Sequence, residues 1–144
     1  MTISGGEPLF QPDFCFALAS EAKAEGISVV LDTSGYAEME TVKRVMPLID
    51  LFLYDIKFMD CDLHRRFTRV SNPSILNNFR LLANDGRNVR VRIPLVPGVN
   101  DDIDNLSQIK AFVERYAKGS KIDLIPFNNL ISEKYRMLGK ETKV

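Results

Sequence analysis

The chain has 144 residues, and 45% of them are hydrophobic, which is enough for one domain with a packed core. Its 19 basic and 19 acidic side chains cancel, so charge gives no reason to expect nucleic acid or an anionic membrane as the main partner. No apolar run approaches the roughly 20 residues that span a bilayer, and the sequence opens on Met-Thr-Ile-Ser-Gly-Gly rather than on a basic-then-apolar leader. We therefore expect neither a membrane role nor a secretory signal.

Short β-type runs alternate with amphipathic helical stretches, and no repeat or linker interrupts them, so we predict a single domain over residues 1–144. Predicted strands cover residues 2–4, 27–31, 51–54, 89–96 and 122–125. Predicted helices cover residues 12–25 and 39–47, a segment that Asn72 caps and Gly86 ends, and a segment that Asp101 or Asp102 opens and Gly119 closes. This alternation favours parallel βαβ units, in either a doubly wound sheet or a barrel.

Two of the predicted helices have an apolar stripe that we expect to face the core. In the first helix the stripe consists of Phe14, Leu18 and Ala22, which recur at helical spacing. In the last helix it consists of Ile103, Leu106, Ile109, Phe112, Val113 and Tyr116.

The two cysteines, Cys15 and Cys61, stand alone without the spacing of metal ligands. We expect both to be reduced and to pack as small apolar side chains, which favours a cytoplasmic protein.

Polar or glycine-containing segments follow each predicted strand. In a parallel sheet the carboxyl ends of the strands lie on one side, where ligands bind in barrels and open α/β sheets. We therefore predict one polar rim that includes Glu7, Asp32, Asp55, Lys57 and Asn128. The alternative is that these side chains only cap helices or form turns, although turn chemistry does not require Glu7, Asp55 or Lys57.

The segment 2–9, which contains Gly5-Gly6-Glu7-Pro8, resembles the glycine–glycine–glutamate motif of radical S-adenosylmethionine enzymes. Segments 31–36, 54–57 and 92–102 are similar to stretches of the pyruvate formate-lyase activating enzymes, and segments 125–127 and 133–140 continue the similarity in the family's order. The resemblance to this glycyl-radical-activating family covers essentially the whole chain.

The resemblance implies an α/β fold, a partial (β/α)6 barrel with about five parallel strands and the first βα unit missing. It also implies a set of cofactor-binding positions, namely Gly5, Gly6, Glu7, Asp32, Asp55, Lys57, Arg92 and Asn128. The glycine–glycine–glutamate segment would bind the amino group of S-adenosylmethionine, and the other residues would lie around its ribose and carboxylate. Asp32, Thr33 and Asp55 match positions that hold a monovalent cation.

In this family the cofactor chelates a [4Fe–4S] cluster, and its reductive cleavage gives a 5′-deoxyadenosyl radical that acts on a glycine of a partner enzyme. The implied partners are a glycyl radical enzyme, such as pyruvate formate-lyase, and a flavodoxin-like electron donor. The protein supplies placement and exclusion of water, while cofactor and cluster carry the chemistry.

The sequence departs from the family pattern in its cysteines. The family holds the cluster with three cysteines ahead of the glycine–glycine–glutamate segment, and no such triad exists in this sequence. We expect a piece of a longer protein or a truncated product that cannot generate the radical as given. An exposed first strand would then favour either a homodimer through the open sheet edge or a marginally stable monomer.

Three further positions differ from the family or remain open. Asn128 replaces a histidine that contacts the cofactor, and Arg69 replaces a glycine near the peptide-binding region. His64, the only histidine, is either a solvated helix residue or, as the resemblance implies, a substrate-binding residue.

The sequence leaves three hypotheses open for the function. The chain is an incomplete activating enzyme, a non-catalytic cofactor-binding or partner-docking remnant, or an unrelated α/β enzyme that uses Asp55 and Lys57 for acid–base work.

Overall fold

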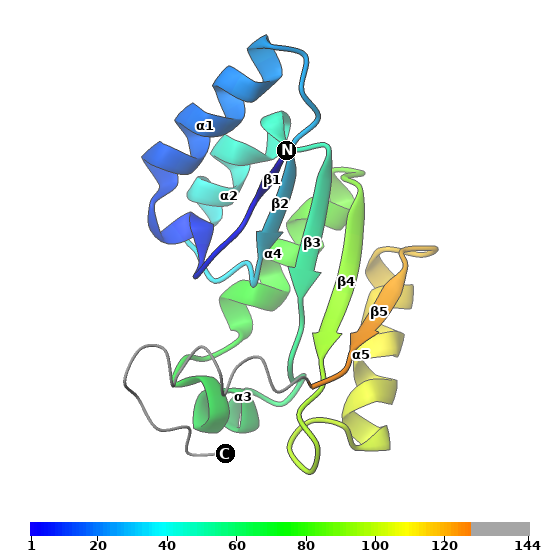
Figure 1. Ribbon diagram of the computed structural model, residues 1–144. Coiled ribbons are helices and arrows are strands. Elements are labelled where there is room, and N and C mark those ends of the chain that lie inside the picture. The colour runs from blue at the N-terminus through cyan, green and yellow to red at the C-terminus, as the bar shows by residue number, and fades with distance from the viewer. Residues whose placement is uncertain (128–144) are drawn as a thin grey trace.

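The computed structural model describes residues 1–127, and these residues form one open sheet of five parallel strands (Figure 1). The strands are β1 (Thr2–Ile3), β2 (Val30–Thr33), β3 (Leu51–Asp55), β4 (Val89–Pro94) and β5 (Ile122–Ile125), and they pair in sequence order. Every pairing is parallel, so all strands deliver their carboxyl ends to the same side. The predicted parallel α/β architecture is confirmed.

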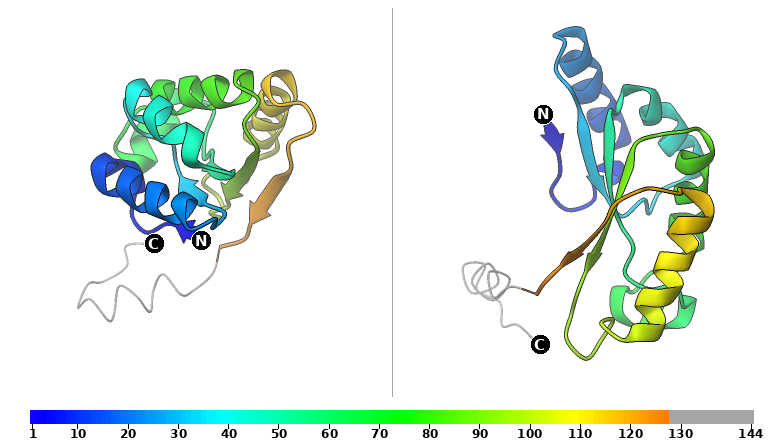
Figure 2. Two further views of the ribbon diagram at one scale, coloured as in Figure 1. Left: turned by 90° about the horizontal axis from the view of Figure 1, so that it is seen from above. Right: turned by 90° about the vertical axis from the view of Figure 1, so that its right-hand side faces the viewer.

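The helices cover one face of this sheet and leave the other face bare within the described residues (Figure 2). They are α1 (Pro12–Ala24), α2 (Met39–Val45), α3 (Cys61–Thr68), α4 (Pro73–Asn84) and α5 (Ile103–Tyr116), with short 3-10 helices η1 (Pro8–Phe10) and η2 (Met46–Leu48). The sheet therefore has a buried helix-covered face and an open inner face, which lie on opposite sides of its pleat.

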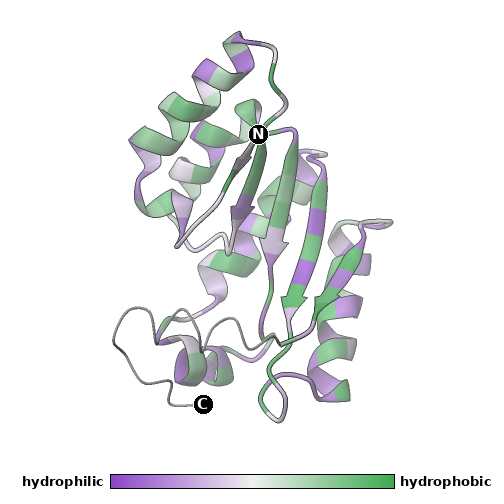
Figure 3. Cartoon of the chain, in the orientation of Figure 1, coloured by the Kyte–Doolittle hydropathy of each residue, from purple (hydrophilic) through white to green (hydrophobic). Residues whose placement is uncertain are grey.

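The pleat of β3 and β4 separates apolar from charged side chains. Phe52 and Tyr54 of β3 and Val91 of β4 are at most 1% exposed and point into the helix-covered core. Arg90 and Arg92 alternate with them and point to the open inner face, because successive strand residues face opposite sides. Figure 3 shows this alternation along β4. The pattern places the charged residues where a ligand has access.

The apolar stripe predicted for the first helix holds for Ala22, which is buried, and for Leu18, which packs against the core, but it is wrong for Phe14. Phe14 is 65% exposed, and α1 also buries Cys15 and Ala19. These small side chains let the helix lie close to the sheet, which a phenylalanine would prevent. Hydrophobicity at helical spacing does not distinguish between two neighbouring faces when both carry apolar residues.

The stripe predicted for the last helix holds for most of its members, but Ile103 is 75% exposed. Ile103 is the first residue of α5, directly after the N-cap Asp102, whose carboxylate accepts from Asn105 N at 2.8 Å. The first turn of the helix therefore lies beyond the edge of the core.

The second strand starts three residues later than predicted. Ile27–Val29 do not join the ladder, and the N–H of Val29 is bound instead by the carboxylate of Asp50 at 2.7 Å. At its other end β2 continues to Thr33, because Asp32 and Thr33 pair with Leu53 and Tyr54 of β3. The strand therefore carries Asp32 within the sheet rather than in the loop after it.

Arg69 ends α3 in a left-handed backbone conformation, with φ of 70°. This conformation costs a residue with a Cβ on the order of 1 kcal/mol and costs glycine little. We expect Arg69→Gly to raise the free energy of unfolding by about 0.5–1 kcal/mol, as measured by urea denaturation. Arg69→Ala, which removes the charge but keeps the Cβ, is the control and should not stabilise. If both variants changed the free energy of unfolding equally, backbone strain at Arg69 would not be the cause.

Candidate functional site

An ion cluster occupies the carboxyl end of the inner face and connects three neighbouring strands. Arg92 of β4 donates from Nε and Nη2 to Asp55 Oδ1 at 3.1 and 2.9 Å, and Nη2 also contacts Asp32 Oδ1 of β2. Lys57 Nζ lies 3.4 Å from Asp55 Oδ2, and Ser4 Oγ donates to Asp32 Oδ2 at 2.9 Å. The sheet register explains the cluster, since Asp55 and Arg92 are direct neighbours across β3 and β4.

The cluster is half-buried, and its charges are closely matched. Burial by itself lowers the pKa of Arg92, but the hydrogen bonds and charges of Asp55 and Asp32 outweigh it and raise that pKa above its usual value. Arg92 is therefore a permanent cation held between two carboxylates. The side chains of Arg92, Asp32 and Asp55 are 22%, 23% and 17% exposed, so a ligand on the inner face can reach them.

Glu7 fastens the turn after β1 to the end of β2. Its carboxylate accepts from Thr33 Oγ1 at 2.6 Å, from Ser34 N and Oγ at 2.9 and 2.6 Å, and from Leu9 N at 3.2 Å. A carboxylate satisfied by four donors acts as a brace, because its lone pairs are already occupied. A direct contact between Glu7 and an ammonium group therefore stays a prediction, and it would need acceptors from the neighbouring backbone as well.

Gly5 and Gly6 form the part of this turn that faces open space. Their φ angles are 98° and 59°, and a Cβ added at either residue would meet no atom within 4 Å. Positive φ is what requires glycine at these positions. Both residues are exposed, and they directly follow Ser4, whose hydroxyl donates to Asp32 of the ion cluster. Backbone carbonyl oxygens are suitable acceptors for an ammonium group.

A buried set of asparagines, which the sequence analysis missed, holds the loop that carries Lys57. Asn105 Nδ2 and Asn100 Nδ2 donate to Lys57 O at 3.1 and 3.2 Å, and Asn105 Oδ1 accepts from Met59 N at 3.1 Å. Asn72 Nδ2 donates to Phe58 O at 2.9 Å instead of capping α4 as predicted. Asparagine carries both donors and an acceptor, so it can satisfy the backbone of a buried loop. Periodicity gives no signal for such residues.

His64 is buried rather than solvated, since it is 3% exposed. Its Nδ1 lies 2.8 Å from the carbonyl oxygen of Val70, so Nδ1 carries the proton and Nε2 is left as an acceptor. Desolvation lowers the pKa of His64, and the charge of Lys57 lowers it further, although the hydrogen bond to Val70 opposes both effects. The ring borders a cavity of about 300 Å³ that Glu7 and Lys57 also line. The solvated reading is wrong, and the substrate-binding role stays a prediction.

Burial of His64 makes stability depend on pH. Because the pKa of His64 is lower in the folded chain than in the unfolded chain, the unfolded chain binds a proton at higher pH than the folded chain does. The contribution of His64 to the free energy of unfolding is therefore fully present above the usual histidine pKa of about 6.5 and declines as pH falls below it. We expect urea denaturation to show a lower free energy of unfolding at about pH 5.5 than at about pH 7.5. His64→Gln, in a chain with this single histidine, should flatten that difference. If the free energy of unfolding of the variant depended on pH as much as that of the unaltered chain, a group other than His64 would cause the pH dependence.

The residues expected to hold a monovalent cation do not all point the same way. Asp32 and Asp55 share the inner face, whereas the hydroxyl of Thr33 donates to Glu7 on the other side of the strand. Between residues 1 and 127 no group of three or more His, Cys, Asp or Glu side chains is arranged to hold a metal ion. Asn128 lies outside the described residues.

Neither cysteine lies in the ion cluster. Cys15 is 1% exposed within α1, and desolvation together with the charge of Glu7 raises the pKa of its thiol, which disfavours the thiolate form. Cys61 begins α3, where it is partly exposed and 3.7 Å from Arg65 Nη2. Both are free thiols. The expected burial is therefore confirmed for Cys15 and only partly for Cys61.

Parallel strands bring paired glycines, a braced glutamate and an ion cluster to one rim of an α/β fold, which is the side where such folds generally bind ligands. The pattern of the radical SAM superfamily matches residues 1–108. The chain therefore belongs to the radical SAM superfamily, whose members use S-adenosylmethionine and a [4Fe–4S] cluster.

The relatives of the chain are glycyl-radical-enzyme activating enzymes. The chain is 40% identical to the (2S)-3-sulfopropanediol dehydratase activating enzyme of Klebsiella oxytoca, over 100% of this chain and 46% of that protein. It is 41% identical to the trans-4-hydroxy-L-proline dehydratase activating enzyme of Clostridioides difficile, over 98% of this chain and 47% of that protein. The chain thus spans about half the length of the curated relatives it matches.

A solved structure also resembles the chain along nearly its whole length. A domain of pyruvate-formate lyase-activating enzyme from Bacteroides vulgatus superposes with a TM-score of 0.79 and 32% identity, covering 99% of this chain and 96% of that one. The recognised family and the predicted partial fold are therefore confirmed. Among the described residues no helix is long and apolar enough to cross a membrane.

Proposed function

We propose that this chain forms the S-adenosylmethionine-binding part of a glycyl-radical-enzyme activating enzyme. The observation that carries the proposal is the ion cluster of Arg92, Asp32 and Asp55 beside the open Gly5-Gly6 backbone, on the uncovered face of the sheet. The cofactor has an ammonium group, a carboxylate and a ribose, and the rim offers acceptors and donors for each.

The residues present fit S-adenosylmethionine in chemistry. The Gly5 and Gly6 carbonyl oxygens would accept from its ammonium group, with Glu7 holding the turn in place. Arg92 and Lys57 would donate to its carboxylate or ribose oxygens, and Asp55 would keep both cations oriented. Asp32 and Asp55 are also the carboxylates from which a monovalent cation site would be built, with Thr33 contributing through its backbone.

The residues present do not fit the iron–sulfur cluster. The sequence contains two cysteines, and the thiol of Cys15 is buried in α1. Three thiolates are needed to hold a [4Fe–4S] cluster in this family, so no step through a cluster is derived for this chain. With the cluster present, S-adenosylmethionine supplies a 5′-deoxyadenosyl radical to such enzymes.

Calorimetric titration of the chain with S-adenosylmethionine tests the proposal. We expect saturable binding with one site per chain, and no comparable heat with ATP, which shares the adenosine but lacks the amino acid. Absence of binding in a folded chain would overturn the cofactor proposal.

Anaerobic reconstitution with iron and sulfide tests whether this chain by itself can hold a cluster. Because the chain has two cysteines, we expect absorption near the cluster band to stay well below one cluster per chain. A stoichiometric cluster would contradict this expectation. An unrelated acid–base role for Asp55 and Lys57 is disfavoured, because Arg92 already occupies the Asp55 carboxylate.

We infer the partner proteins from the resemblance to the glycyl-radical-activating family. A glycyl radical enzyme, for which pyruvate formate-lyase is the default, would be the protein substrate, and a flavodoxin-like protein would supply the electron. The cytoplasm is proposed because both cysteines are free thiols. A homodimer through the outer edge of β1 is proposed because, among the described residues, that edge pairs with no strand.

A further inference from the structure

Three buried asparagine side chains from separate parts of the chain meet at the loop that follows β3. Asn72 directly precedes α4, Asn100 lies in the loop after β4, and Asn105 lies in the first turn of α5. We call these three residues the asparagine cluster. Because they are buried, their amide groups need hydrogen-bond partners within the protein.

The asparagine cluster bonds the loop backbone where the sheet no longer does so. β3 ends at Asp55, so the residues that follow leave the strand. Backbone groups of residues 57–59 are bonded instead by asparagine side chains at 2.9–3.2 Å, namely Lys57 O by Asn100 and Asn105, Phe58 O by Asn72, Met59 N by Asn105, and Met59 O by Asn72. Without these partners the backbone groups would have to move to reach water. The path of residues 57–59 therefore depends on the asparagine cluster.

The same cluster also holds the end of β4. Asn100 Nδ2 donates to Pro94 O at 2.9 Å, and Asn100 Oδ1 accepts from Val96 N at 2.7 Å. Asn105 Nδ2 in turn donates to Asn100 O at 3.1 Å. Pro94 is the last residue of β4, the strand that carries the arginine of the ion cluster. The asparagine cluster therefore joins the end of that strand to the loop that carries Lys57.

Lys57 depends on this support for the position of its ammonium group. Its Nζ lies 3.4 Å from Asp55 Oδ2, whereas Arg92 donates to Oδ1 of the same carboxylate. The lysine side chain is 33% exposed and has a flexible four-carbon stem, so packing does not fix its charged end. The region that Nζ can reach is therefore set by the backbone of residue 57, which the asparagine cluster holds.

We propose that Asn105 is a positioning residue, which with the rest of the asparagine cluster keeps the Lys57 ammonium beside Asp55. The inference rests on the proposed function, in which Lys57 donates to carboxylate or ribose oxygens of S-adenosylmethionine. A loop that is held in place before the ligand arrives loses less conformational entropy on binding. Asn105 uses its amide as two donors and one acceptor, whereas an aspartate of the same shape has no N–H to donate.

Acetylation of the unliganded chain tests the position of Lys57 without any cofactor. The reagent is N-hydroxysuccinimidyl acetate, and mass spectrometry gives the rate at Lys57 relative to the rate at Lys43, which lies on α2 outside the ion cluster. We expect Asn105→Ala to raise this ratio at least about threefold, because a lysine released from its carboxylate partner is more often open to the reagent. Should Asn105→Ala fail to fold by circular dichroism, Asn72→Ala, which removes two bonds to the same loop, should raise the ratio as well.

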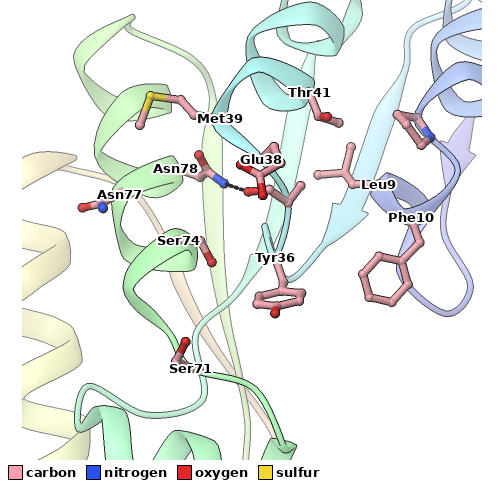
Figure 4. Close-up of a pocket in the computed structure, with 12 residues that line it drawn as sticks. Leu9, Phe10, Tyr36, Glu38, Met39, Thr41, Ser71, Ser74, Asn77 and Asn78 are labelled. Carbon is pink, nitrogen blue, oxygen red and sulfur yellow. Dashed lines mark hydrogen bonds between the residues drawn. The ribbon is translucent and has the colours of Figure 1, made fainter.

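Asn78→Ala is the matched control, because Asn78 is also a buried asparagine but lies outside the asparagine cluster. Its Nδ2 donates to Gly35 O and to Ala37 O at 2.9 Å each, and a dashed line in Figure 4 marks the second bond. The control also removes two buried hydrogen bonds, but it should leave the acetylation ratio unchanged. An unchanged ratio in a folded variant of the asparagine cluster, or an equal rise in Asn78→Ala, would overturn the positioning role.

A double-mutant cycle with S-adenosylmethionine connects the position of Lys57 to binding. By calorimetry, Asn105→Ala should weaken binding about fivefold in the unaltered chain and less than about twofold in Lys57→Ala, because the asparagine acts through that lysine. A merely structural role would lower the affinity by the same factor in both backgrounds, and that result would overturn the inference. If the unaltered chain binds no S-adenosylmethionine, the proposed function fails, and acetylation alone then decides whether Asn105 positions Lys57.

Discussion

Replacing Gly35 by alanine is expected to lower the free energy of unfolding by at least about 3 kcal/mol. Gly35 follows β2 with φ of 70°, and a Cβ built on it would lie 1.7 Å from Tyr54 Oη and 2.2 Å from Tyr54 Cζ. Tyr54 cannot move away, because it is 1% exposed and its hydroxyl donates to Ile75 O at 2.7 Å. Relief would require a shift of β3 or of the β2 end, where Ser34 meets Glu7.

Urea denaturation measures this effect. The variant Gly86→Ala separates the cost of the clash from the cost of a left-handed backbone conformation. Gly86 has φ of 69°, and a Cβ there would meet nothing within 4 Å. The control should therefore cost about 1 kcal/mol, the usual cost of a left-handed conformation for alanine. If the two variants lost the same stability, the packing of Tyr54 against Gly35 would not be the cause.

Arg92→Ala is expected to weaken S-adenosylmethionine binding by at least about tenfold, since charge-assisted hydrogen bonds are each worth on the order of 1.5–3 kcal/mol. The substitution removes the cation that Asp32 and Asp55 share. The two carboxylates then lie close together with Lys57 alone, at 3.4 Å from Asp55, to offset them. A ligand carboxylate would meet net negative charge instead of a guanidinium.

Arg90→Ala is the matched control for this prediction. Arg90 lies two residues earlier on the same strand and the same face, and it pairs with Asp123 at 3.2 Å rather than with the cluster. Calorimetry should give the control an affinity within about twofold of the unaltered chain. A loss as large as that of Arg92→Ala would mean that general positive charge, and not the cluster, attracts the ligand.

The parallel arrangement of the strands and the position of the rim could be predicted from the sequence, because strands alternate with helices and each buried strand ends in polar residues. The order in which the strands pair could not be predicted from this pattern. Asp55 was expected on that rim, and Arg92 was expected near the cofactor from the family resemblance; the two meet as direct neighbours. The shared contact of Arg92 with both aspartates could not be predicted, since it depends on the register between strands. Register is set by long-range pairing, which a single sequence does not reveal.

Other errors arose where local pattern and tertiary packing compete. His64 has charged neighbours in sequence and reads as solvated, yet the fold buries it against Phe58 and the carbonyl of Val70. Phe14 has the helical spacing of a core residue, yet the sheet accepts only the small side chains next to it. For Phe14 the deciding contacts come from the sheet, whereas for His64 they come from Phe58 and Val70, which flank α3 six residues away on either side.

The bare inner face of the sheet has an electrostatic consequence. With water on that side, the attraction among Arg92, Asp32 and Asp55 is reduced by a high effective dielectric and is further screened as ionic strength rises. Any molecule that lies over the face displaces this water and strengthens every charge contact beneath it. A ligand that covers the face thus also strengthens its own charge contacts. The association rate should therefore depend more strongly on salt concentration than the dissociation rate of the formed complex.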